Sequence, residues 1–360
     1  MIGEGEARLS PGGGLPQPSW QDGAVRFRYP PGIPQRVRRV TDSRSNCSCR
    51  ASRSRNLPTN GARTYGASRG GGAVDGFAAG ATARQLRLAA ELRRLRDAAG
   101  LTAREAATLL GGVSPVQISH IESGLAGGVS ESRLRSLAAH YACTDRQLVE
   151  ALVAMATDRT RGWWEEFRGG LLPTPFLDLA ELEHHATFLR EAQFLYVPGP
   201  LQTEDYARAV YAYRVPELPE HEVELRVRHR MRRKVILERP TPTPYEAVVH
   251  EAALRIMVSD RATSRAQLAR VLELSEAEHV TVRVVPFDLE GFAGAGSAMT
   301  YVGGALPKLD TVVRDGPHGA AFIDSEAQLG AFRTLFHKVE DVSLDPKRSR
   351  DLIHRLAKEL

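Results

Sequence analysis

Cysteine is scarce in this sequence, and long apolar runs are missing. Only three of the 360 residues are cysteine, and two of these lie in a segment too poor in apolar residues to fold alone. We therefore expect a reducing compartment and no disulfide framework. No stretch approaches the roughly eighteen consecutive apolar residues that a membrane-spanning helix needs. The N-terminus also lacks the apolar core of a secretory signal, so we expect a cytoplasmic protein.

The overall composition is that of a globular protein, but the charge is unevenly distributed. Hydrophobic residues make up 42% and charged residues 25% of the chain, which is typical of soluble domains. A chain of 360 residues is expected to hold two or more domains. Residues 1–83 contain twelve basic and five acidic residues, 84–143 eight and five, and 144–360 twenty-eight and thirty-three. Any affinity for nucleic acid is therefore expected in the front part of the chain.

Residues 1–82 are predicted to be a disordered extension. They are rich in Gly, Pro, Ser and Arg, and they offer too little apolar surface to offset the entropy of ordering the chain. An arginine-rich arm that contacts phosphates is the alternative. Cys47 and Cys49 have no further ligands at the spacing of a metal site. Backbone breakers recur at Pro11–Gly14, Pro30–Gly32 and Gly70–Gly72.

Residues 102–124 have the pattern of two short helices joined by a tight turn. Thr102 and Glu105 have the spacing of a capping box, which predicts where the first helix begins. Gly111 and Gly112 then end that helix.

The second helix has an equally clear beginning. Ser114 is predicted as its N-cap, Pro115 suits the first helical position, and Gln117 completes a second capping box. Ile118 and Ile121 are three residues apart and are predicted to point inward. A short outward face without acids fits the major groove of DNA. That face carries Pro115, Val116, Gln117, Ser119 and His120.

Further helices are predicted around this pair. Leucines recur at helical spacing from Thr82 or Ala83 to Gly100. Ser130 is predicted to cap a helix, and Thr144 with Gln147 to cap another that runs to about residue 157.

These residues resemble the helix-turn-helix of the Cro/phage-repressor (XRE) family of bacterial regulators. The resemblance implies a mainly α domain of five helices over 83–158 that binds double-stranded DNA as a homodimer on paired half-sites. The alternative is a helical hairpin without a nucleic-acid role. Gln117 and His120 are the expected readers of base edges, and Ser114 and Ser119 are expected to contact phosphate or polar base edges. The full set of expected DNA contacts is Thr102, Arg104, Ser114, Pro115, Val116, Gln117, Ser119 and His120. The match runs through Leu101-Thr102, Ala107, Leu110-Gly111, Val113-Ser114, Ile118-Ser119, Ile121-Glu122 and Gly124.

Residues 162–360 are predicted to form a second, α+β domain. Apolar faces at helical spacing include Trp163, Trp164 and Phe167, and a longer one from Phe176 to Leu189. Thr203 is predicted to start a helix with acids in its first turn. Ser264 with Gln267 and Ser325 with Gln328 are predicted to cap two more. Five short strands follow the pattern of a mostly antiparallel sheet: Tyr245–His250, His279–Pro286, Ser297–Val302, Thr311–Arg314 and Ala320–Ile323.

A basic helix is predicted from Glu222 to Glu238. Val223, Val227, Met231 and Val235 recur every four residues and would form its buried face. The other face could be a second DNA contact, a seat for an acidic partner or an ordinary solvated surface. It carries Arg226, Arg228, Arg230, Arg232, Arg233 and Lys234.

A second resemblance covers residue 162 to the C-terminus. The segments that carry it are 197–210, the basic helix after them, 250–255, 267–288 and the closing SRDLIHRLAKEL. They are similar to a domain found downstream of XRE-type motifs in actinomycete regulators, described as antitoxin-like and related to the sporulation regulator WhiJ. This resemblance implies a regulator encoded beside a small protein partner.

Catalysis is not expected. The glycine-rich Gly291–Gly296 lacks the Lys-Ser/Thr pair of a phosphate loop, and neither His184-His185 nor His250-Glu251 has partners at metal spacing. We therefore predict no enzyme activity, no cofactor and no metal. A remote alternative is self-cleavage by a serine–lysine dyad, for which Ser297 and Lys308 are the nearest candidates among few lysines.

The sequence leaves two functions for the second domain. A sensor of a small-molecule ligand predicts an enclosed apolar pocket with a few polar groups. A module for a small protein partner predicts an exposed apolar patch or a groove. The family resemblance favours the protein partner, in a cytoplasmic and nucleoid-associated regulator.

Overall fold

The computed structural model describes residues 17–21, 24–28, 62–64, 81–125, 128–292, 298–316 and 319–360. Its contacts divide the chain into two units, Met1–Thr59 and Asn60–Leu360. In the first unit, β1 (Gln17–Gln21) pairs antiparallel with β2 (Ala24–Arg28). Most of residues 1–82, which are predicted to be disordered, lie outside the described residues.

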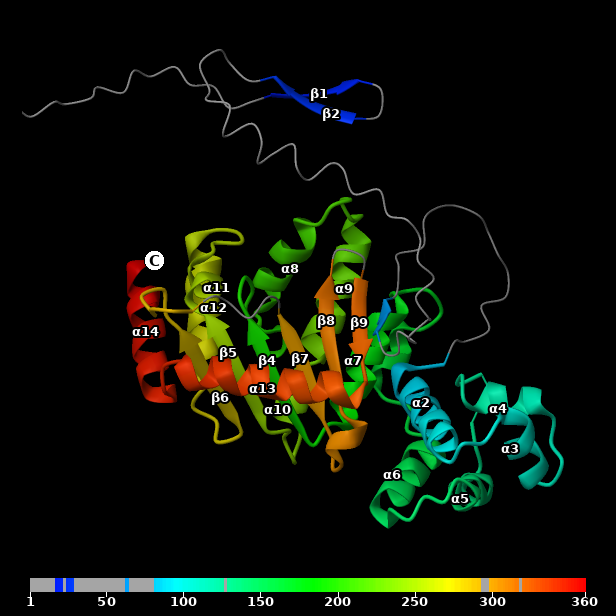
Figure 1. The fold of residues 1–360 in the computed structure, drawn as a ribbon. Coiled ribbons are helices and arrows are strands. Elements are labelled where there is room, and N and C mark those ends of the chain that lie inside the picture. Colours follow the sequence, from blue (N-terminus) through cyan, green and yellow to red (C-terminus); the bar gives the residue numbers. More distant parts are fainter. Residues whose placement is uncertain are drawn as a thin grey trace, which may run out of the picture. The chain divides into compact units, whose positions relative to one another are not determined.

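Five helices are described between residues 81 and 158, as the helix-turn-helix resemblance implies (Figure 1). They share one hydrophobic core, in which Leu92, Ile118 and Leu134 are completely buried. The last helix begins one residue later than predicted, because the Asp145 carboxylate, not the Thr144 hydroxyl, accepts the Leu148 N–H (3.0 Å). The helices are α2 (Ala83–Ala98), α3 (Ala103–Leu109), α4 (Pro115–Ile121), α5 (Glu131–His140) and α6 (Arg146–Thr157).

The C-terminal region is built on a mixed sheet with the strand order β3-β9-β8-β7-β4-β5-β6. Strands β4, β5 and β6 run parallel, and the other neighbours are antiparallel, so the prediction of a mostly antiparallel sheet is confirmed. The strands are β3 (Ala62–Thr64), β4 (Phe188–Gln193), β5 (Tyr245–His250), β6 (Val280–Val285), β7 (Met299–Gly303), β8 (Thr311–Gly316) and β9 (Gly319–Ile323).

Helices cover both faces of this sheet. Because most of its strand pairs are antiparallel, the region is α+β as predicted. On one face, side chains of β4, β5 and β6 pack with α12 (Arg261–Leu274) and α14 (Pro346–Glu359). On the other face they pack against α13 (Glu326–Val342), which crosses the sheet in Figure 1. The remaining helices are η1 (Trp163–Phe167), α7 (Thr174–His185), η2 (Gly199–Leu201), α8 (Glu204–Ala212), α9 (Glu220–Arg232), α10 (Val235–Glu238), α11 (Glu251–Arg255) and η3 (Pro307–Leu309).

The outer edge of β6 is closed by the segment that joins α13 to α14 and by the first turn of α14. The Leu344 amide donates to the Val284 carbonyl, and the Val284 amide donates to the Ser349 hydroxyl, both at 2.9 Å. Ser349 is completely buried. This edge would otherwise present unpaired backbone groups to other chains.

Several predicted boundaries are wrong. The apolar pattern from Phe176 to Leu189 is not one helix, because α7 ends at His185 and Leu189 lies in β4, a strand that the sequence analysis missed. The helix predicted to start at Ser264 is capped by Asp260 instead, and Ser264 is buried within it. No described helix is long and apolar enough to cross a membrane.

Candidate nucleic-acid interface

The first helix of the motif begins at the predicted capping box. The Thr102 hydroxyl accepts the Glu105 N–H (3.2 Å), and the Thr102 N–H donates to the Glu105 carboxylate (2.8 Å). These hydrogen bonds to Thr102 lower the pKa of Glu105. The box is confirmed, and it fixes the chain direction as α3 enters the motif.

The turn between α3 and α4 depends on two successive glycines. Gly111 and Gly112 have φ values of 82° and 79°, which lie in the left-handed region. A residue with a Cβ is strained in this region by about 1–2 kcal/mol. The Gly-Gly pair therefore permits a turn that other residues would resist.

The second helix is also capped as predicted. The Ser114 hydroxyl accepts the Gln117 N–H (3.2 Å), and the Ser114 N–H donates to Gln117 Oε1 (3.1 Å). Pro115 occupies the first turn, where its missing N–H costs nothing. Ile118 and Ile121 are buried in the helical core, as predicted.

The outward face of α4 is uncovered in the structure. All eight residues predicted to contact DNA have exposed side chains: Thr102, Arg104, Ser114, Pro115, Val116, Gln117, Ser119 and His120. The Ser119 hydroxyl donates to the Pro115 carbonyl (3.1 Å), which leaves its lone pairs free to accept. Their individual roles toward DNA stay predictions.

A buried ion pair, which the sequence pattern did not predict, holds α4 against α2. Arg96 Nε and Nη2 donate to the two carboxylate oxygens of Glu122 at 2.7 and 2.9 Å. Arg96 also donates to the Leu101 carbonyl (2.6 Å), so one guanidinium ties together three segments. Its hydrogen bond with Glu122 raises the pKa of Arg96. The signal in the sequence is an acid placed directly after Ile121, at the end of the second helix.

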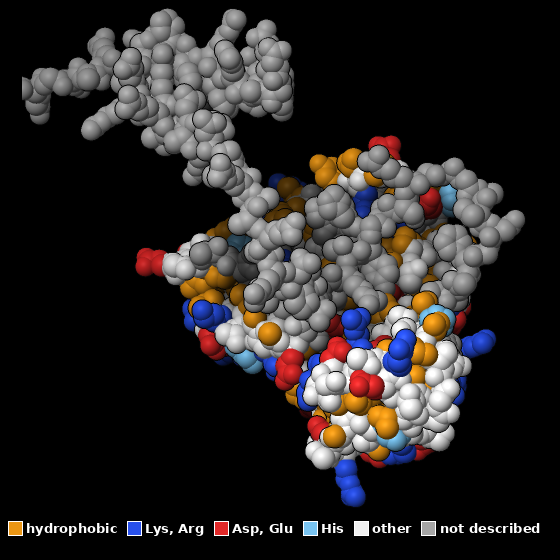
Figure 2. Space-filling view, turned by 45° about the vertical axis from the view of Figure 1, so that its right-hand side comes forward, with side chains coloured by type: hydrophobic (Ala, Val, Ile, Leu, Met, Phe, Trp, Pro, Cys, Tyr) orange, Lys and Arg blue, Asp and Glu red, His pale blue; other side chains and the backbone are white. Residues whose placement is uncertain are grey.

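Basic side chains are scattered around the motif. Figure 2 shows separate basic and acidic side chains on the helical group, which has come forward in this view. Arg104 and Arg133 are exposed, and their guanidinium groups have no hydrogen-bond or ion-pair partner among the described residues. Arg135 is instead bound to Glu131 (2.8 Å) and Glu150 (2.7 Å). Arg104 and Arg133 are therefore available to phosphates.

The C-terminal region contacts this helical group away from the outward face of α4. The Ala83 amide, at the start of α2, donates to the Asp178 carboxylate of α7 (3.0 Å). Burial raises the pKa of Asp178 to about 7. Leu306 and Leu309 also pack against the helical core. The outward face of α4 is thus left open by its described neighbours.

The predicted basic helix does not present a continuous basic face. It is broken into α9 and α10, and Arg226 and Arg233 are buried. Arg233 forms a buried ion pair with Glu183 (2.5 Å), and Arg230 donates to the Tyr211 hydroxyl (2.6 Å). The valine periodicity of the helix could not reveal that these arginines are paired, because Glu183 and Tyr211 lie on other elements. A second DNA contact through the whole set of arginines is therefore excluded.

The other residues considered for chemistry lie in structural positions. His184 and His185 end α7, and burial lowers the pKa of both, that of His185 to about 4. His250 ends β5 and caps α11 by accepting the Ala252 N–H (3.1 Å). No group of three or more metal-binding side chains is found in the described parts of the chain.

The structure describes only one of the two residues of the serine–lysine alternative. Lys308 lies in the 3-10 helix η3, where its carbonyl accepts a hydrogen bond from Arg87. Ser297 and most of the glycine-rich segment Gly291–Gly296 lie outside the described residues.

Two family models match the chain. Residues 87–152 match a helix-turn-helix domain, and residues 176–355 match a domain of unknown function, DUF5753. No curated protein and no solved structure matches the chain. The first match suggests a DNA-binding regulator and agrees with the XRE-like resemblance of the motif. Because the second match spans half of the sequence, the chain belongs to the DUF5753 family.

Proposed function

We propose that the protein is a sequence-specific, antitoxin-like transcription regulator, related to the WhiJ-type regulators of actinomycetes. It binds operator DNA as a homodimer at the nucleoid, and its C-terminal domain binds a small protein partner. The proposal includes no catalytic step and no cofactor.

The observation that carries the proposal is the uncovered polar face of α4. The helix is anchored from behind by Ile118 and Ile121, and its first turn is fixed by the Ser114–Gln117 box. Gln117 and His120 remain exposed on the other side. A rigid helix with a polar face free of acids matches the donor and acceptor pattern of the major groove.

Gln117 keeps its base-reading capacity although it caps the helix. Its Oε1 accepts the Ser114 N–H (3.1 Å), but an amide oxygen has a second lone pair and the amide nitrogen has two N–H groups. Gln117 can therefore form the bidentate pair with adenine that glutamine typically makes. Arg104 would contact a flanking phosphate, and the free lone pairs of the Ser119 hydroxyl would accept from a donor on a base edge.

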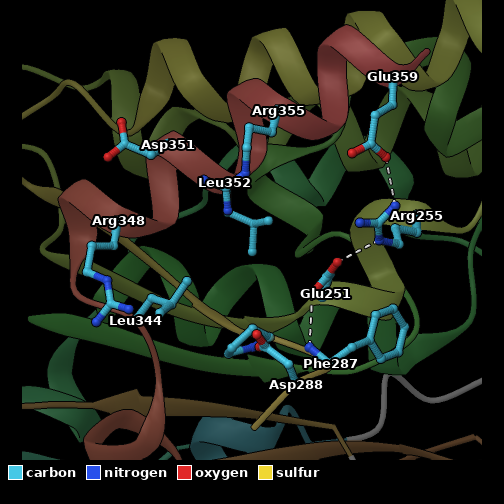
Figure 3. Close-up of a pocket in the computed structure, with 11 residues that line it drawn as sticks. Glu251, Arg255, Phe287, Asp288, Leu344, Arg348, Asp351, Leu352, Arg355 and Glu359 are labelled. Carbon is cyan, nitrogen blue, oxygen red and sulfur yellow. Dashed lines mark hydrogen bonds and ion pairs between the residues drawn. The ribbon is translucent and has the colours of Figure 1, made fainter.

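The shape of the C-terminal region favours a protein partner over a small metabolite. A sensor needs an enclosed and largely apolar pocket. The groove of about 700 Å³ beside α14 is open and is lined largely by charged residues (Figure 3). Ligand sensing is the alternative function, and self-cleavage by Ser297 and Lys308 is a remote one.

The proposal is tested by selecting binding sites from a random duplex library with the full chain. We expect an enriched motif with two related half-sites, and an affinity that falls steeply as salt rises. The matched control for substitutions of Gln117 is Gln147→Ala, which changes an exposed glutamine of α6 outside the predicted DNA-binding face. Absence of any enriched motif, with binding that is equal on all sequences, would contradict sequence-specific recognition.

A further inference from the structure

The 304–310 loop, which joins β7 to β8, packs against the DNA-binding helices. Leu306 and Leu309 of this loop lie against the hydrophobic core that the five helices share. In Figure 1 the loop is the orange turn below β7 and β8, on the side of α2 and α6. The helical core is therefore completed by two leucines that belong to the C-terminal region.

The loop has a fixed conformation, because a buried aspartate joins its two ends. Asp310 Oδ1 accepts the Gly304 N–H (2.8 Å), and Asp310 Oδ2 accepts a hydrogen bond from the Tyr301 hydroxyl (2.6 Å). Arg333 of α13 donates to the same Tyr301 oxygen (2.9 Å). Asp310 is only 2% exposed, so water competes little with these hydrogen bonds. The loop is thus a rigid part of the C-terminal region.

The first turns of α2 are bound to the same region. The Arg87 guanidinium donates to the Lys308 carbonyl of the loop, and the Ala83 N–H donates to the Asp178 carboxylate of α7 (3.0 Å). Arg87 is buried and also lies 3.6 Å from the buried carboxylate of Glu91, within α2. A rotation of α2 within this contact would leave buried donors and acceptors without partners, which is costly. The contact therefore favours a single orientation of the helices.

These contacts leave the outward face of α4 free. Gln117 and His120 are exposed, whereas the C-terminal region holds the helices at the start of α2. A contact that fixes the helices without covering the predicted DNA-reading side chains suits positioning better than occlusion.

We propose that the 304–310 loop is a positioning element: it fixes the orientation of the DNA-binding helices on the C-terminal region, and thereby the distance between the two half-sites that a dimer reads. This inference rests on the proposed function, since it needs a homodimer on paired half-sites. Leu306, Leu309 and Asp310 are the positioning residues, and they act through the helices. In a dimer the separation of the two reading helices determines the spacing of the half-sites. A rigid contact permits one spacing, whereas a flexible connection permits several.

The experiment compares the binding sites that the full chain and the variant Leu306→Ala/Leu309→Ala select from a random duplex library. We expect the unaltered chain to enrich two half-sites at one spacing. The variant should enrich the same half-site sequence at several spacings, because its helices lose their fixed orientation. Its affinity for the paired site should fall at least fivefold, since a flexible connection lowers the effective concentration of the second reading helix. Its affinity for a single half-site should stay within about twofold of that of the unaltered chain.

A second pair of variants loosens the loop without removing an apolar contact. Asp310→Ala removes the hydrogen bonds that join the ends of the loop and should broaden the spacing in the same way. Asp310→Asn should retain the single spacing, because its amide oxygen can accept from Gly304 and its amide nitrogen can donate to Tyr301. The matched control is Leu171→Ala/Leu195→Ala, which changes two exposed leucines of the C-terminal region and should leave the spacing unchanged. Circular dichroism establishes that each variant is folded.

The outcomes separate this inference from the proposed function. An unchanged spacing in the folded Leu306→Ala/Leu309→Ala and Asp310→Ala variants would overturn the positioning role and leave the regulator intact. Tighter binding at the same spacing would also overturn it, because the loop would then restrain DNA binding. If the unaltered chain enriches no paired motif, the homodimer of the proposed function is wrong, and this inference is wrong with it.

Discussion

Substitution of Gln117 separates its two roles, because its side chain is assigned both to the helix cap and to DNA. In the structure, Gln117 Oε1 accepts the Ser114 N–H at 3.1 Å. Gln117→Glu keeps this cap, since a glutamate also completes a capping box. It removes the amide donor, however, and brings a carboxylate close to DNA. Gln117→Ala removes both the cap and the base contact.

A lost bidentate base contact costs about 1–3 kcal/mol, which raises the dissociation constant about 5- to 150-fold. We therefore expect both variants to bind the selected operator more weakly, with Gln117→Glu affected at least as strongly as Gln117→Ala. Fluorescence anisotropy at fixed salt measures the affinity, and thermal unfolding monitors the cap. If Gln117→Glu bound as tightly as the unaltered protein, the side chain would serve the helix alone, and the assignment of Gln117 as a base reader would be refuted.

Three further predictions concern stability, each read from urea unfolding. Arg96→Met should lower the free energy of unfolding by about 3–5 kcal/mol, because it leaves the buried carboxylate of Glu122 without its arginine. The control Arg93→Met removes only the exposed pair with Asp97 and should cost less than about 1 kcal/mol. Equal losses in the two variants would contradict the role of Arg96 in anchoring α4. Burial raises the pKa of Asp178 to about 7, so the ionised form of Asp178 opposes folding. As pH rises from about 4 through 7, the free energy of unfolding of the unaltered protein should therefore fall relative to that of Asp178→Asn. Parallel pH profiles of the two proteins would refute this. Ser349→Ala should cost about 1–3 kcal/mol because the amide of Val284 loses its acceptor, and an unchanged midpoint would show that this amide finds another partner.

The sequence predicts local structure well where a helix carries its own start and stop signals. The start of α4 is fixed by three residues within four positions: Ser114 caps the helix, Pro115 suits its first turn, and Gln117 bonds back to the cap. These interactions need no distant partner. The predicted β5 agrees with the structure at both ends: it begins directly after Pro244 and ends where α11 begins. Where two possible N-caps are adjacent, as at Thr144 and Asp145, residue type alone does not decide which of them caps the helix.

The missed strand β4 shows the limit of periodicity. Apolar residues from Phe176 to Leu189 fit a helical period, yet Leu189 pairs with β5 and β7 in the middle of the sheet. A short apolar run fits either element, and the neighbouring strands decide between them. Those neighbours lie about 55 and 110 residues further along the chain, so no local window contains them.

The sequence by itself determined the helix-turn-helix motif and its outward residues, because caps, glycines and the isoleucine spacing act within about four residues of one another. Only the tertiary structure decided which charges are free. Arg96 and Arg233 became buried in ion pairs with Glu122 and Glu183, whereas Arg348 and Arg355 were left beside an open groove. The physical reason is that the partner of a charged side chain is chosen by the packing of distant elements, which a pattern along one helix does not contain.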